Sequence, residues 1–229
     1  MPDDARPDWY RDIVASYDTV AEQYAADYYD ELSRKPFDRE LLTKFAGLMP
    51  NEGQVADIGC GPGHVARYLA DLGVNAIGVD LSRSMVEVAR RLNPGLLFEQ
   101  GDIFHLPFAD ASFAGIAAFY SLIHIERSRV PEALRELFRV LSTGGHILLA
   151  FHAGEGEVHV EQYHSRGEQK GPEIALHVTF FEIGEFEQYL QAAGFKVEES
   201  LEREPYQFEY PSRRAYILAR KSSIVTSPT

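Results

Sequence analysis

Short apolar runs alternate with segments of helical period from residue 54 onward, and this alternation restricts the possible folds more than any other feature of the chain. The runs that have the length and apolar content of buried strands are residues 54–58, 76–80, 96–100, 113–119, 146–151, 195–200 and 215–220. Between most of them, apolar residues recur at intervals of three and four, as in helices that pack against a sheet. Strands that alternate with helices predict an α/β fold whose mostly parallel sheet has helices on both faces.

Capping and turn residues indicate where several of these helices begin and end. Ser84 and Glu87 have the spacing of a capping box, which predicts a helix start at this point. Pro131 suits the first turn of a helix. Gly194 suits the end of a helix predicted at residues 182–193.

The same pattern divides the chain into regions. Residues 1–50 are expected to form a helical lid or cap, with helices at 8–30 and 37–49, and residues 51–221 are expected to form the core. Residues 154–178 have no strong period, so we expect an irregular excursion beside the ligand site. Residues 222–229 are expected to be a flexible tail.

The charge and cysteine content exclude several classes of protein. The 229 residues include 22 Lys and Arg against 35 Asp and Glu, which gives a formal net charge of −13. Proteins that bind phosphate backbones normally present a basic face, so neither nucleic acid nor a membrane surface is an expected partner. The single cysteine, Cys60, excludes an intramolecular disulfide and is typical of a reducing compartment. We expect a cytoplasmic protein that is a monomer or a homodimer.

A glycine-rich loop joins the first predicted strand to the helix that follows it. Gly59, Gly61 and Gly63 lie in the sequence Asp-Ile-Gly-Cys-Gly-Pro-Gly. Glycines at this position let the chain turn sharply and let a ligand approach the backbone. Asp80 ends the next predicted strand, where a carboxylate can accept both hydroxyls of a ribose. The loop and Asp80 together predict a ligand that contains a nucleoside.

The residue before the loop indicates which nucleoside is bound. A dinucleotide fingerprint has the spacing G-x-G-x-x-G, whereas the glycines here are two residues apart. The carboxylate of Asp57 would repel a pyrophosphate and would attract an ammonium group. S-adenosylmethionine (SAM), an adenosine with a cationic amino-acid tail, satisfies both requirements, and an NAD-dependent dehydrogenase is the rival interpretation. Cys60 is interpreted as a small loop residue rather than a nucleophile.

Several motifs, in order along the chain, resemble the class I SAM-dependent methyltransferases, particularly the small-molecule branch called methyltransferase type 11. DIGCGPG resembles the family's first motif, GVDLS its ribose-binding strand end, GDIFHLPFADASF its adenine-binding segment, EALRELFRVLSTGGHILLAF its next helix and strand, and YDTVAEQY its lid. The resemblance implies SAM as cofactor and S-adenosylhomocysteine (SAH) as product. The cofactor-binding residues that it implies are Tyr17, Tyr24, Asp57, Gly59, Gly61, Gly63, Asp80, Leu81, Met85, Asp102, Ile103 and Phe119.

The resemblance also implies the arrangement of the sheet. The expected fold is Rossmann-like, with seven strands in the order 3-2-1-4-5-7-6 and the last strand antiparallel. Ligands of such sheets lie at the carboxyl ends of the strands. One residue departs from the family pattern, because Ala114 stands where these families usually carry Asp. We expect this change to alter loop packing rather than to inactivate the site.

The residues that act on the methyl acceptor are harder to identify. His124 follows the fourth predicted strand, where substrate and methyl group usually meet in this family, so it is the candidate general base, with His152 second. His159 and His164 with Glu161 match no metal-site template, so we expect no metal. We expect methylation of a small-molecule acceptor, first on oxygen. N-methylation and a non-catalytic SAM-binding module are the alternatives.

Overall fold

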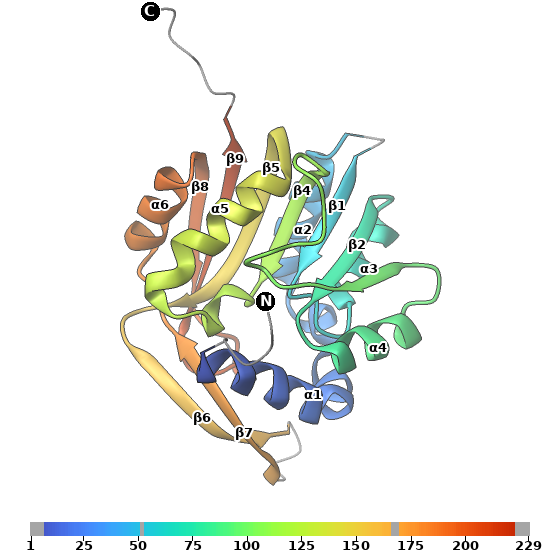
Figure 1. The fold of residues 1–229 in the computed structure, drawn as a ribbon, viewed down its shortest axis with the longest axis vertical. Helices are drawn as coiled ribbons and strands as arrows, with labels where there is room; N and C mark the ends of the chain where they lie inside the picture. The colour runs from blue at the N-terminus through green and yellow to red at the C-terminus, as the bar shows by residue number, and fades with distance from the viewer. Residues whose placement is uncertain (1–6, 51–52, 166–169, 223–229) are drawn as a thin grey trace, which may run out of the picture.

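The computed structural model describes residues 7–50, 53–165 and 170–222, so the predicted tail at 222–229 lies outside the described residues except for its first position. The central sheet has seven strands in the order β3-β2-β1-β4-β5-β9-β8 (Figure 1). These are β1 (Gln54–Ile58), β2 (Asn75–Asp80), β3 (Leu97–Gln100), β4 (Phe113–Phe119), β5 (Leu141–Ala153), β8 (Phe195–Arg203) and β9 (Arg213–Lys221). The first five are parallel, and β9 runs antiparallel between β5 and β8. The predicted Rossmann-like sheet, including its antiparallel last strand, is confirmed.

The central strands are buried on both faces, which explains why they read as continuous apolar runs. In β1, Ala56 lies opposite Ile77 of β2 on one side and Ile116 of β4 on the other. All three side chains are at most 3% exposed. Because β1, β2 and β4 run in the same direction, their carboxyl ends meet at one edge of the sheet.

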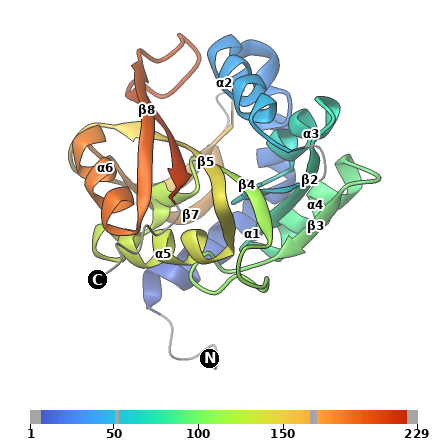
Figure 2. The same ribbon diagram turned by 90° about the horizontal axis from the view of Figure 1, so that it is seen from above.

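Helices cover the two faces of this sheet (Figure 2). On one face lie α5 (Val130–Val140) and α6 (Ile183–Ala192), and on the other lie α2 (Pro36–Gly47), α3 (His64–Asp71) and α4 (Arg83–Leu92). The second of the two predicted N-terminal helices, α2, therefore belongs to a layer of the core, with Leu42 and Phe45 packed among residues of β1, β4 and β5.

The helix ends agree with the sequence signals in two cases out of three. Pro131 lies in the first turn of α5, and Gly194, with φ of 100°, follows α6. The predicted capping box of Ser84 and Glu87 is wrong, because α4 begins at Arg83. Its N-cap is Ser82, whose Oγ accepts the N–H of Met85 at 3.1 Å.

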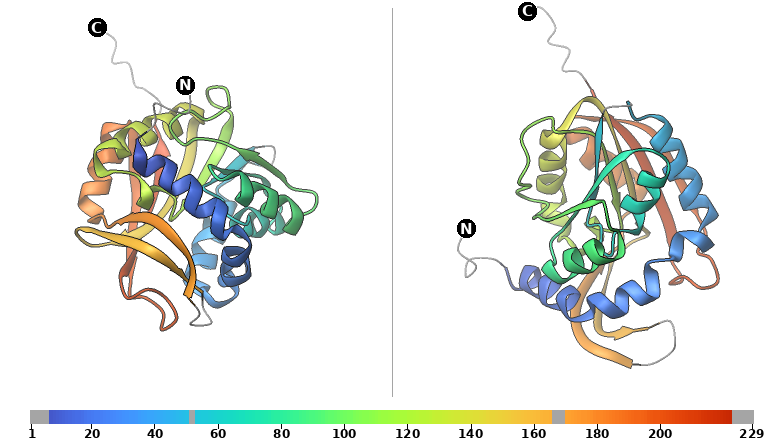
Figure 3. Two further views of the ribbon diagram at one scale, coloured as in Figure 1. Left: turned by 60° about the horizontal axis from the view of Figure 1, so that its bottom comes forward. Right: turned by 90° about the vertical axis from the view of Figure 1, so that its right-hand side faces the viewer.

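The first helix, α1 (Asp8–Tyr28), lies on neither face but crosses the edge where β1, β2 and β4 end (Figures 1 and 3). Beside it lies an antiparallel hairpin of β6 (Glu157–His164) and β7 (Lys170–Thr179). Our expectation of irregular structure at residues 154–178 is therefore wrong. Most positions of the hairpin are half-buried or exposed, so its strands carry Glu, His and Gln and lack the apolar runs of the central sheet.

Candidate functional site

A cleft lies at the carboxyl ends of β1, β2 and β4, beneath α1. Its walls come from α1, the glycine-rich loop after β1, the ends of β2 and β4, and the segment after β3. The predicted site residues that line it are Tyr17, Tyr24, Asp57, Gly59, Gly61, Asp80, Leu81, Met85, Asp102, Ile103, Phe119 and His124. Gly63 does not line it but is the N-cap of α3, where its φ of 84° turns the chain into the helix.

The glycine-rich loop adopts backbone conformations that favour glycine. The φ angle is 71° at Gly59 and 51° at Gly61. A Cβ atom on Gly59 would lie 2.3 Å from the Cβ of Ser121, so any side chain there would clash with the segment after β4. The N–H of Gly59 also donates to the carbonyl of Val79 at 2.7 Å. The loop is thus held against both neighbouring strands.

Asp80 places a carboxylate at the end of β2. Its Oδ2 accepts the N–H of Gly61 at 2.8 Å, and its Oδ1 accepts the N–H of Ser82 at 2.9 Å. Burial raises the pKa of Asp80 to about 6, while these N–H donors oppose the increase. The carboxylate is therefore mostly ionised at pH 7, and its remaining lone pairs can accept hydroxyl groups.

Asp57 lies beneath the loop and is 1% exposed. Its Oδ2 accepts the N–H of Ala66, in the first turn of α3, at 3.0 Å. Burial raises the pKa of Asp57 to about 7. The side chain therefore supports the start of α3 and is only partly ionised at neutral pH.

Side-chain hydrogen bonds fasten α1 to the start of α4. Asp18 accepts the hydroxyl of Ser82 at 2.5 Å and the N–H of Ser84 at 3.1 Å. Ala21 packs in the same apolar cluster as Met85. These contacts hold α1 over the end of β2, where Asp80 lies.

Tyr17 and Tyr24 extend from α1 with their rings edge to face, 5.8 Å between centroids. A Cβ on Gly61 would lie 3.8 Å from the ring of Tyr24, so this ring covers the glycine-rich loop. Burial raises the pKa of both tyrosines above its ordinary value, so both hydroxyls are neutral at pH 7.

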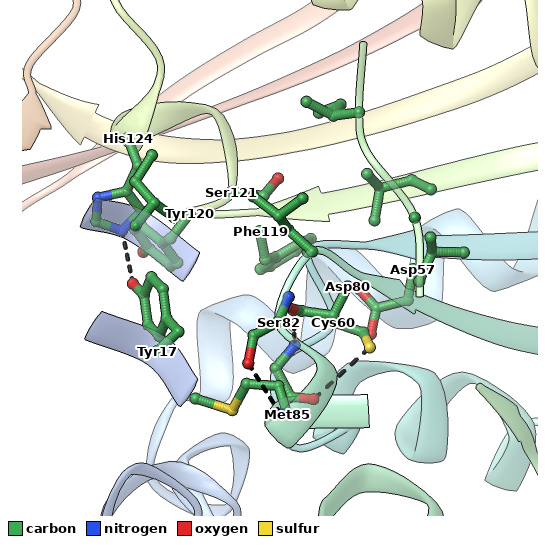
Figure 4. Close-up of a pocket in the computed structure, with 18 of the residues that line it drawn as sticks. Tyr17, Asp57, Cys60, Asp80, Ser82, Met85, Phe119, Tyr120, Ser121 and His124 are labelled. Carbon is green, nitrogen blue, oxygen red and sulfur yellow. Dashed lines mark hydrogen bonds between the residues drawn. The ribbon is translucent and has the colours of Figure 1, made fainter. Parts of the chain in front are cut away.

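His124, in the 3-10 turn η3 (Leu122–His124), contacts two other elements of the molecule, and its contact with Tyr17 is shown in Figure 4. Its Nδ1 lies 2.7 Å from the carbonyl oxygen of His177 in β7, and its Nε2 lies 2.6 Å from the hydroxyl of Tyr17. Because a carbonyl only accepts, Nδ1 carries the hydrogen, and Nε2 accepts the proton of Tyr17. Burial lowers the pKa of His124 to about 4, so the ring is neutral and its basic nitrogen faces α1.

The other candidate histidines lie elsewhere. His152 does not line the cleft; its Nδ1 lies 2.8 Å from the hydroxyl of Ser212, and burial lowers its pKa to about 3. The ring of His159 lies against that of His177, 3.7 Å between centroids, whereas His164 contacts the carbonyl of Gln162. In the described ranges we find no group of three His, Cys, Asp or Glu arranged to hold a metal ion. Nor is any described helix both long and apolar enough to cross a bilayer.

Several polar residues of the cleft were not predicted from the sequence. Glu31 belongs to the 3-10 turn η2 (Glu31–Arg34), and its Oε1 lies 3.2 Å from Nε2 of His64. Nδ1 of His64 and Oγ of Ser121 are buried and have no hydrogen-bond partner within the described residues. His64 directly follows the glycine-rich loop and Ser121 lies two residues after β4, and both positions could have been predicted from the sequence. The contact of Glu31 spans 33 residues and leaves no local pattern.

Comparisons with known proteins agree with this geometry. Residues 55–145 match a family model described as a methyltransferase domain. A demethylmenaquinone methyltransferase of Renibacterium salmoninarum is 32% identical over 149 residues, which cover 64% of this chain and 60% of that protein. A malonyl (acyl-carrier protein) O-methyltransferase of Pectobacterium atrosepticum is 36% identical over 127 residues, which cover 54% of this chain and 47% of that protein.

A solved structure extends the likeness to most of the fold. The 1,6-didemethyltoxoflavin-N1-methyltransferase of Burkholderia thailandensis, crystallised with 1,6-didemethyltoxoflavin and SAH, has a TM-score of 0.66 at 18% identity. The match covers 93% of this chain and 87% of that one.

The sheet order, the glycine-rich loop and the acidic end of β2 define a Rossmann-like fold whose cleft suits a nucleoside. Residues 55–145, which contain the glycine-rich loop and Asp80, match the methyltransferase domain, and the fold of the chain resembles that of SAM-dependent methyltransferases. The chain spans 47–60% of the lengths of the first curated relatives that it matches.

Proposed function

We propose that the protein transfers a methyl group from SAM to a small-molecule acceptor, with oxygen as the first choice of methylated atom. One observation carries this proposal. A single cleft beneath α1 joins the carboxylate of Asp80, which suits a ribose, to the basic Nε2 of His124, which suits a hydroxyl proton.

The residues of the cleft fit the cofactor. Asp80 would accept the ribose hydroxyls, Leu81 and Met85 would pack against the adenine, and Asp102 with the amide of Ile103 would meet its edge. Tyr17, Tyr24 and Phe119 would cover the cofactor, and Gly59 and Gly61 would let it approach the backbone. The Oγ of Ser121 is buried and has no hydrogen-bond partner among the described residues, which supports a ligand at this point because such polar atoms normally have a partner.

SAM supplies an electrophilic methyl group on a cationic sulfur. The protein must hold the acceptor at about 3–3.5 Å on the correct line, exclude water and take up a proton where the acceptor is a hydroxyl. His124 would take that proton at Nε2, because the carbonyl of His177 fixes its other nitrogen in the protonated form. In the described structure Tyr17 occupies Nε2, so the acceptor either displaces its hydroxyl or transfers a proton through it.

The residues that line the cleft indicate what kind of acceptor it can hold. Trp9, Tyr10, Ile13 and Val14 of α1 add apolar and aromatic groups to the lining of the cleft, which suits a small, partly aromatic molecule. The relative from Pectobacterium atrosepticum is named for methylation of oxygen, and the fold neighbour from Burkholderia thailandensis is named for methylation of N1. N-methylation, which needs no base when the amine is neutral, is therefore the second candidate.

The first test is ligand binding. SAH at a hundredfold excess over its dissociation constant should stabilise the protein by about 2.7 kcal/mol, and NAD should not. Thermal unfolding with each ligand measures the difference, and equal shifts with NAD would refute the assignment.

The second test is turnover. Incubation with methyl-labelled SAM and a metabolite library should yield one labelled product and an equal amount of SAH. Binding of SAH without any labelled product across the library would favour a non-catalytic SAM-binding module.

A further inference from the structure

Glu31 and His64 form an ion-pair site at the glycine-loop end of the cleft, outside the motifs that resemble those of the methyltransferases. Both side chains line the cleft, and each is nearly nine-tenths buried, with side-chain exposures of 12% and 13%. Glu31 also pairs with Lys35 at 2.9 Å, which holds the acid from behind. These contacts lower the pKa of Glu31 to about 2, so the cleft contains a fixed anion at this end.

The pair is not complete within the described protein. Glu31 accepts the Nε2–H of His64, but Nδ1 of the same ring is buried with no hydrogen-bond partner there. A buried ring nitrogen without a partner is costly in a polar site, and a ligand that supplies one removes this cost. With both nitrogens protonated, the ring can donate to Glu31 on one side and to an anionic group on the other.

The alternative residue for a cationic group, Asp57, is less suited to it. Its carboxylate lies beneath the loop, bonded to the N–H of Ala66, and is only partly ionised at neutral pH. Glu31 is fully ionised and lies in the wall of the same cleft, next to the residue that directly follows the glycine-rich loop.

We propose that the Glu31–His64 pair recognises the amino-acid tail of the cofactor, Glu31 binding the α-ammonium group and His64 Nδ1 the α-carboxylate. This inference rests on the proposed SAM-binding function. A zwitterion carries its two charges a few bonds apart, and a fixed acid beside a ring donor complements both charges at once. The pair therefore determines specificity: it distinguishes SAM and SAH from adenosine compounds that lack the tail.

Calorimetric titration with three compounds separates the two contacts. SAH carries both charged groups, decarboxylated SAH carries only the ammonium, and 5′-methylthioadenosine carries neither. Glu31→Gln should lower the affinity for SAH and for decarboxylated SAH by about 10- to 100-fold, the loss expected for a charged hydrogen bond. The affinity for methylthioadenosine should stay within about threefold of the wild-type value. His64→Gln keeps a polar group near the position of Nε2 but has none at the position of Nδ1. It should therefore lower the affinity for SAH alone, by a similar factor.

Asp57→Asn is the matched control, because it removes the other acid of the same region. It should leave the ratio of SAH affinity to methylthioadenosine affinity near the wild-type value. The inference would be overturned if both Glu31→Gln and His64→Gln kept the wild-type ratio of the two affinities. It would also be overturned if Asp57→Asn lowered this ratio strongly. Wild-type protein that binds none of the three compounds would instead refute the proposed function. If Glu31→Gln fails to fold, the affinities of His64→Gln for SAH and for decarboxylated SAH still test the inference, because only the first should fall.

Discussion

The two sides of the cleft are positioned by different kinds of interaction. On the cofactor side, Asp80 bonds to backbone N–H groups 2 and 19 residues away, between the loop after β1 and the start of α4. On the acceptor side, Tyr17 bonds to His124 across 107 residues, and Asp27 bonds to Tyr163 across 136. The cofactor side is therefore built into the sheet, whereas the acceptor side depends on a few polar contacts between α1, η3 and the β6–β7 hairpin. We expect substitutions on the two sides to affect different measurements.

The largest expected effect is on turnover, from the acceptor side. General-base catalysis contributes about 10²- to 10⁴-fold, so His124→Gln should lower kcat by that factor and leave SAH affinity nearly unchanged. Steady-state kinetics and calorimetry together check this. A variant that keeps more than about a third of wild-type turnover would show that His124 only shapes the pocket.

The pH dependence sharpens the same prediction. A base acts in its neutral form, and burial lowers the pKa of His124 to about 4. The acid limb of kcat should therefore lie near pH 4 rather than near the ordinary value of about 6.5. The measurement should use kcat, because the pKa of about 6 at Asp80 will also affect KM. An acid limb of kcat near 6.5 would mean that the ring is solvated when the acceptor is bound.

The next largest effect should appear on the cofactor side. Asp80→Ala removes a carboxylate that would accept ribose hydroxyls, and each charged hydrogen bond contributes about 1.5–3 kcal/mol. We expect SAH to bind at least about tenfold more weakly, with methylthioadenosine weakened equally because it keeps the ribose. Wild-type affinity in a folded Asp80→Ala protein would place the nucleoside elsewhere.

A smaller effect should follow from separating α1 from the hairpin. Asp27 is buried and accepts the hydroxyls of Tyr163 and Ser165, so Asp27→Ala should lower the free energy of unfolding by about 1–3 kcal/mol. Hydrogen exchange should accelerate in α1 and in β6–β7 together and stay slow in β1 and β4. The exposed pair of Glu22 with Arg91 gives the control, because Glu22→Gln should change stability by less than about 1 kcal/mol. Faster exchange in β1 and β4 would show that the two sides are not independent.

The smallest effect is expected at Cys60, on the cofactor side. Its thiol is buried, and burial raises its pKa well above the ordinary value, so it is not a nucleophile at neutral pH. Cys60→Ala should keep both turnover and SAH affinity within about threefold. Loss of turnover with intact SAH binding would assign the thiol a chemical role.

The same difference explains which features the sequence predicted. The glycine-rich loop and Asp80 were predicted because their constraints are local: φ angles that favour glycine and a carboxylate at a strand end. The hairpin was not, since its strands pack only partly and carry no apolar run. The partners of His124 and the Glu31–His64 pair depend on contacts between distant segments, which no local pattern encodes.

The contacts of α1 also bear on how the chain is assembled during synthesis. Its partners Ser82, His124, Tyr163 and Ala175 all come 64 or more residues after the positions that they bind. The helix α1 therefore leaves the ribosome before all of these partners, and it obtains its full set of contacts only after the strands beneath it have been made. Until then α1 does not cover the edge of the sheet where β1, β2 and β4 end.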